Sequence, residues 1–198
     1  MNRRYVLLLV LLITSLGIKA APSPRLEFSA NPSAADITRA RIFEEPLVPI
    51  GTEPSTGENA ALADALAKYS TRATSDDFTS LAKFLEQHPG SPWKAALLTS
   101  LGLEYYNTAY YSRALDAWTR AWSIAKEATD SRGKAIGDRA AGELAYMYAR
   151  LGRMVELEAL LKSVEGRVFV GSATEKIERA RGGCEQHANR CHKHYLPT

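Results

Sequence analysis

Cysteine and sustained charge of one sign are both scarce in this 198-residue chain. Its two cysteines both lie after residue 183, which excludes a disulfide-rich scaffold. The sequence has no phosphate-binding loop, no Gly-x-Ser-x-Gly and no His-Glu-x-x-His. A cysteine peptidase needs a nucleophile and a histidine base held by a fold, whereas both cysteines here lie in a glycine-led tail. We therefore expect no enzyme activity and no cofactor.

The first 21 residues have the layout of a secretory signal peptide. They combine a basic start, an apolar run from Tyr5 to Ile18 and small residues at Ala20 and Ala21. The run is shorter than the roughly 20 apolar residues of a membrane span, although an uncleaved anchor is the alternative. We expect an exported protein, periplasmic or secreted, that does not contact the membrane once the signal is removed.

The net charge of +3 belongs to this targeting segment. It holds Arg3, Arg4 and Lys19 and no acidic residue, so 22 basic and 22 acidic residues remain without it. A nucleic-acid-binding protein needs a basic stripe, and none follows in the rest of the chain. We expect no nucleic-acid partner.

Proline marks the next region. Six of the nine prolines lie in residues 22–58, which predicts an irregular, extended arm, because an interior proline breaks a helix. The pattern also predicts local helix around Ala34 to Ile42. Apolar residues predict that part of the arm docks on the remainder of the protein; they are Ile42, Phe43, Leu47, Val48 and Ile50.

Residues 59–181 carry apolar side chains at helical spacing, which predicts an all-α domain. Two segments within it share one pattern of large and small residues at identical intervals. The first copy consists of Leu101, Gly102, Tyr105, Tyr111, Ala114, Trp118 and Ala121. The second copy consists of Leu144, Ala145, Tyr148, Met154, Leu157, Leu161 and Val164.

The shared pattern resembles the tetratricopeptide repeat, a helix–turn–helix unit with a usual period of about 34 residues. The two copies begin 43 residues apart, which is similar to the extended repeats of some tetratricopeptide families. The resemblance implies an antiparallel helix-hairpin solenoid. In it, the small Gly102 lets the second helix approach, while Tyr105, Tyr111 and Trp118 fill the wedge between helices.

A second resemblance concerns the whole region after the signal. The stretch FLEQHPGSPWKAALLTSLGLEYY is similar to repeats of bacterial envelope proteins. The region from RIFEEPLVPIG to VEGRVFVGSATEKI is similar to the repeat-bearing N-terminal part of large secreted bacterial proteins, some of which continue into a papain-like peptidase module. The alternative interpretation is therefore a shortened or truncated relative of such a protein.

The tetratricopeptide resemblance implies protein–protein interaction through the concave face formed by the first helix of each pair. The residues of that face not needed for the core are Thr99, Leu103, Tyr106, Asn107, Arg139, Glu143, Tyr146 and Arg150. An arginine there can fork onto a partner's carboxylate. The alternative is that these are ordinary solvated residues. The chaperone-tail-binding subclass requires lysine and asparagine where Thr99 and Leu103 stand, so its carboxylate clamp is not carried over.

Residues 182–198 form a Cys/His-rich segment, which we expect to be a flexible tail beyond a last helix. Ser172 and Glu175 predict the start of that helix, and Gly182 and Gly183 predict its end. A zinc set is one alternative for the tail, formed by Cys184, His187, Cys191 and His194. A disulfide between Cys184 and Cys191, or a tail with no role, are the others. Export favours the disulfide over metal binding.

Overall fold

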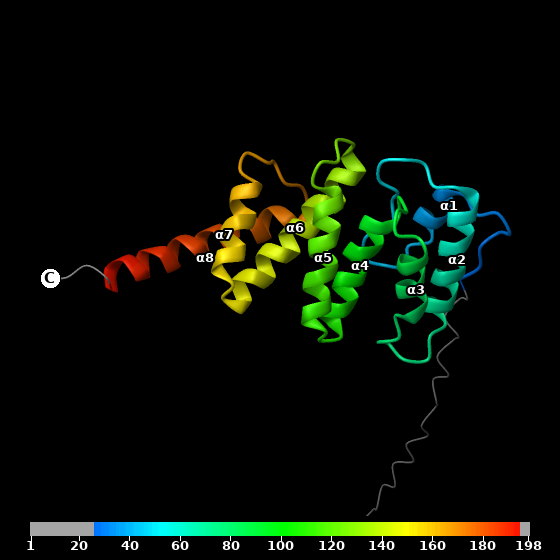
Figure 1. Ribbon diagram of the computed structural model, residues 1–198, viewed down its shortest axis with the longest axis horizontal. Helices are drawn as coiled ribbons and strands as arrows, with labels where there is room; N and C mark the ends of the chain where they lie inside the picture. Colours follow the sequence, from blue (N-terminus) through cyan, green and yellow to red (C-terminus); the bar gives the residue numbers. More distant parts are fainter. Residues whose placement is uncertain (1–25, 195–198) are drawn as a thin grey trace, which may run out of the picture.

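The computed structural model describes residues 26–194, with side chains through Glu185. The described residues form helices and no strand (Figure 1), so the predicted all-α class is confirmed. The helices are α1 (Ala34–Arg39), α2 (Thr56–Ser70), α3 (Thr79–Gln87), α4 (Lys94–Asn107), α5 (Tyr111–Ala125), α6 (Ser131–Leu151), α7 (Met154–Ser163) and α8 (Ser172–His194). The predicted signal segment lies outside the described residues.

Side chains fix where several helices begin. Ser33 and Ser55 each form a capping box, with Asp36 for α1 and with Glu58 for α2. The Asp130 carboxylate accepts two backbone N–H groups at the start of α6. These caps satisfy donors that have no partner within the helix.

The α4–α5 and α6–α7 pairs turn in the same way. Ala109 and Gly152, equivalent residues of the two sequence copies, have φ of 65° and 67°. The next N–H donates back across each turn, from Tyr110 to the Tyr105 carbonyl at 2.8 Å and from Arg153 to the Tyr148 carbonyl at 2.9 Å. The repeated sequence pattern therefore corresponds to a repeated backbone turn.

Gly102 allows α4 and α5 to pack closely. A Cβ at Gly102 would lie 2.2 Å from Nε1 of Trp118, whose side chain is fully buried. That indole donates to the Thr99 carbonyl at 3.2 Å. The prediction for Tyr111 is wrong: it is 48% exposed and packs against Tyr106 instead of filling the wedge. It begins α5, where its side chain points out of the helix pair.

The arm docks on the helices as its apolar residues predicted. Phe43, Leu47 and Val48 are buried in the same core as α2 to α6. The Thr38 hydroxyl donates to the Leu47 carbonyl, and the Ile50 N–H donates to the Pro92 carbonyl. The arm is thus anchored on the helical core through a few buried side chains.

The last helix differs from expectation. α8 continues through Gly182 and Gly183 to His194; its first turns pack on α6 and α7, and its C-terminal end projects beyond the other helices (Figure 1). A helical rise of about 1.5 Å per residue separates the Cα atoms of Cys184 and Cys191 by about 10 Å. A disulfide spans at most about 7 Å between Cα atoms, so this pairing would require the helix to open.

Of the four residues predicted for a zinc set in the tail, only Cys184 has a described side chain. The side chains of His187, Cys191 and His194 lie outside those described. Cys184 Sγ lies 3.8 Å from Glu158 Oε1, and burial together with that carboxylate raises the pKa of the thiol. Among the described side chains, no cluster of three or more histidine, cysteine or acidic residues could hold a metal ion. No helix within residues 26–194 is long and apolar enough to cross a membrane.

Candidate functional site

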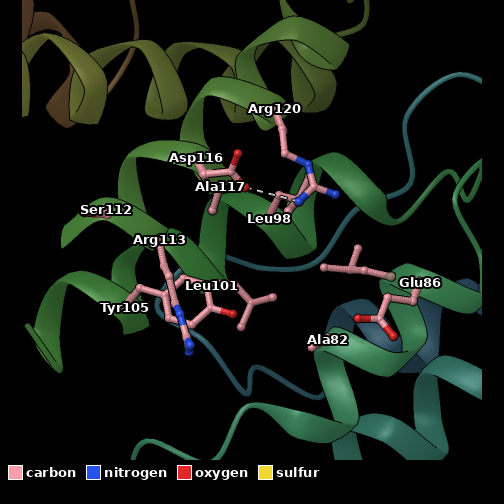
Figure 2. A pocket seen from close by; sticks show the side chains of 11 residues that line it. Ala82, Glu86, Leu98, Leu101, Tyr105, Ser112, Arg113, Asp116, Ala117 and Arg120 are labelled. Carbon is pink, nitrogen blue, oxygen red and sulfur yellow. Dashed lines mark hydrogen bonds and ion pairs between the residues drawn. The ribbon is translucent and has the colours of Figure 1, made fainter. Parts of the chain in front are cut away.

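Two of the hollows in the described part of the molecule are lined by tyrosine together with charged side chains. The first, of about 400 Å³, lies between α3 and α5 with α4 beneath it (Figure 2). The floor of this hollow exposes little side-chain surface, because Leu98 and Leu101 are each only 2% exposed. On its wall, Arg120 is already paired with Asp116 at 3.2 Å.

The second hollow, of about 340 Å³, lies among α4, α6, α8 and the arm. We call it the α6 groove and define it by its lining residues, Glu44, Leu103, Tyr106, Asn107, Arg139, Glu143, Tyr146, Glu175, Lys176 and Arg179. It combines half-exposed tyrosines with several charged groups. Of these residue types, tyrosine and arginine are the ones enriched in protein–protein interfaces.

The structure brings together most of the predicted binding residues. Six of the eight line the α6 groove: Leu103, Tyr106, Asn107, Arg139, Glu143 and Tyr146. A seventh, Arg150, donates from Nη1 to the phenol oxygens of Tyr106 at 3.0 Å and Tyr146 at 2.9 Å. The residues from α6 are spaced by four, three and four positions, which places them along one helix face.

Thr99 does not belong to this surface. It is 0% exposed, and its hydroxyl donates to the Ala95 carbonyl at 2.9 Å within α4. Every residue from Ala95 to Gly102 is buried, so α4 has no free face over that stretch. The prediction that Thr99 contacts a partner is therefore wrong.

Arg139 joins the arm to α6. Its guanidinium donates to Glu45 at 2.7 Å, to Glu44 at 3.1 Å and to Glu143 at 2.7 Å. Burial alone would lower the pKa of the Arg139 guanidinium. The neighbouring carboxylates raise this pKa by more, so the net effect is a pKa above the usual value. Lys176 of α8 also binds Glu143, which is almost fully buried.

Arg150 stands apart from the other cations of the site. Lys176 pairs with Glu143 and Arg179 with Glu175, whereas the described residues give Arg150 no carboxylate partner. Its hydrogen bond lowers the pKa of Tyr146, and the same bond raises the pKa of Arg150. Arg150 therefore remains fully charged and open to solvent.

Sequence reasoning missed four lining residues that come from elsewhere in the chain. Glu175, Lys176 and Arg179 lie in α8, and Glu44 lies in the arm. The spacing of three residues between Lys176 and Arg179 indicated one helix face, but nothing local indicated that this face meets α6. Glu44 reaches Arg139 across a separation of 95 residues.

No protein-family model, curated protein or solved structure matches this chain. The function must therefore be argued from the groove itself.

Proposed function

We propose that this protein is an exported, tetratricopeptide-like scaffold that binds an extended segment of a partner protein in the α6 groove. The observation that carries the proposal is the grouping of Tyr106, Tyr146 and Arg150. The two tyrosine rings pack partly on the core and are partly exposed, and the exposed Arg150 beside them has no carboxylate partner among the described residues. Tyrosine and arginine are enriched where proteins make their strongest contacts.

The repeat assignment is supported by the shared turn. Ala109 and Gly152 take the same left-handed conformation at equivalent positions, and the same backbone hydrogen bond follows each of them. Helix pairs of this kind are protein-binding units in the tetratricopeptide family, so the resemblance and the groove favour the same class of function.

Position-specific crosslinking tests the binding proposal. A photoactivatable amino acid at Asn107, which is exposed in the groove, is expected to capture a partner protein in intact cells. The matched position is Ser112, which is exposed at the hollow between α3 and α5. Capture from Ser112 alone, or equal capture of the same proteins from both positions, would contradict the assignment of the α6 groove.

Side-chain variants then test the contacts. Tyr146→Ala combined with Arg150→Ala should weaken binding of the captured partner while changing the melting temperature little. The matched control is Tyr110→Ala with Arg113→Ala, because Arg113 lies 5.0 Å over the Tyr110 ring, much as Arg150 lies 5.4 Å over Tyr146. Equal loss of binding in both double variants would refute the site.

Export is a separate proposal that rests on residues 1–21. The expected mature N-terminus is Pro22, which N-terminal sequencing of the protein isolated from its own cells would identify. A protein that retains Met1 and stays with the cytoplasmic fraction would overturn it.

A further inference from the structure

The charges of the α6 groove, taken with those of the adjoining Glu45 and Arg150, are balanced in total but divided between two ends. At one end, Arg139 and Lys176 face three carboxylates, those of Glu44, Glu45 and Glu143. This end therefore carries one excess negative charge. Arg179 and Glu175 neutralise each other.

At the other end, Arg150 supplies one excess positive charge. Its guanidinium is held by phenol oxygens alone among the described residues, through Nη1. The described hydrogen bonds use no other nitrogen of Arg150, so its remaining N–H donors are open to a ligand. Arginine binds a carboxylate through two such donors.

The distance between the two ends follows from the helix. Arg139 and Arg150 are eleven residues apart on α6, which is about 16 Å at 1.5 Å per residue and close to three full turns. Both ends therefore lie on one face of α6. An extended chain covers this distance in about five residues at roughly 3.3 Å each.

Exposure decides which group is open at the acidic end. The Glu143 side chain is 5% exposed and is enclosed by two cations. The Glu44 side chain is 68% exposed although it contacts Arg139. Glu44 therefore presents the excess negative charge to an incoming group.

We infer that the α6 groove binds an extended partner segment that has an acidic side chain on Arg150 and a basic side chain, about five residues away, beside Glu44. This inference rests on the proposed function and adds the chemistry of the partner. Leu103, Tyr106 and Tyr146 contact the residues between the two charges, because they line the groove between its ends. A segment with two like charges would place one of them against a like charge of the protein.

Capped, fluorescent peptides test this charge pattern on the full chain. Four peptide families carry Glu and Lys, Lys and Glu, two Glu or two Lys at positions one and six, with Ser and Tyr between them. Capping removes the terminal charges, so binding reports side chains alone. One of the two mixed-charge families is expected to bind about five- to tenfold more tightly than both like-charge families at low salt, and this advantage should shrink at high salt.

Charge variants of the protein identify which end of the groove binds which charge of the peptide. Arg150→Glu should shift the preference to the family with two Lys, and Glu44→Gln should remove discrimination against the family with two Glu. Arg113→Gln and Glu86→Gln change charges beside the other hollow and should leave every preference unchanged. Melting temperatures confirm that each variant is folded.

Three results would overturn the inference. If all four families bind equally and binding disappears in Tyr106→Ala, the groove binds peptides without this charge pattern and only the inference fails. If no family binds, the inference fails as well, and the crosslinking from Asn107 decides the proposed function independently. A preference for mixed charge that Arg150→Glu leaves intact also contradicts it.

Discussion

Gly102→Ala provides the sharpest test of how the first helix pair packs. In an open helix, replacing glycine by alanine stabilises a protein by up to about 1 kcal/mol. Here the new Cβ would lie 2.2 Å from Nε1 and 2.4 Å from Cδ1 of Trp118. The indole is fully buried, so it cannot move aside without displacing its neighbours.

The expected magnitude comes from two losses. Overpacking a core costs about 1–3 kcal/mol. A displaced indole also loses its hydrogen bond to the Thr99 carbonyl, which leaves a buried donor unsatisfied at a cost of about 1–3 kcal/mol. After the helix gain of up to about 1 kcal/mol is subtracted, we expect destabilisation of about 1–5 kcal/mol. At about 3 °C for each kcal/mol, the melting temperature should fall by about 3–15 °C.

A matched glycine and a compensating variant sharpen the assay. Gly57 also lies in a helix, and its Cβ would have only the Ser55 hydroxyl as a neighbour, at 4.0 Å, so Gly57→Ala should be neutral or stabilising. The second repeat copy has Ala145 and Leu161 at the positions of Gly102 and Trp118. In a Trp118→Leu background, Gly102→Ala should therefore cost less than about 0.5 kcal/mol.

Thermal and denaturant unfolding of the four variants measure this coupling. If Gly102→Ala melts at or above the parent temperature, the close approach of α4 and α5 is wrong. If Gly102→Ala costs the same with and without Trp118, the indole is not the group it meets.

Three further predictions concern other parts of the molecule. The Asp138 carboxylate is fully buried between Lys134 and Arg167, so Asp138→Ala should lower the free energy of unfolding by about 3–5 kcal/mol, measured by denaturant unfolding. Loss of the exposed Asp116–Arg120 pair should lower it by less than about 1 kcal/mol. Equal losses in the two variants would contradict this prediction. Burial and the neighbouring Glu104 raise the pKa of Tyr69, so the native state keeps a phenol proton that the unfolded chain loses above about pH 10. Stability should therefore be fully present below that pH and fall above it, and the fall should be smaller in Tyr69→Phe; an identical alkaline slope in both proteins would refute the assignment. Thr99→Val should leave partner binding unchanged, because the residue is buried. A binding defect without a change in melting temperature would indicate that Thr99 contacts the partner.

Local pattern was enough to predict the helical class and much of the core. The apolar residues of the arm predicted the docking of Phe43, Leu47 and Val48, because several large apolar side chains close together are rarely left exposed to solvent. The small residue at Gly102 predicted a close helix contact, and Trp118 supplies it. Both predictions depend on side-chain size and periodicity, which a sequence states directly.

The end of α8 was predicted wrongly from the same kind of signal. A pair of glycines often ends a helix, but each costs only about 1 kcal/mol inside one. The first turns of α8 are anchored by the buried residues Ala173, Ile177 and Ala180. No proline follows before residue 197, so the helix continues past Gly182 and Gly183.

The sequence by itself determined which side chains of α6 share one face, since Arg139, Glu143, Tyr146 and Arg150 follow helical spacing. Only the tertiary structure decided what each of them meets. The fold brings the carboxylates of Glu44 and Glu45 onto Arg139 from more than 90 residues away in the chain. Within the described part of the chain it gives Arg150 no carboxylate partner. The physical reason is that periodicity is local, whereas the pairing of charges depends on which surfaces burial brings together.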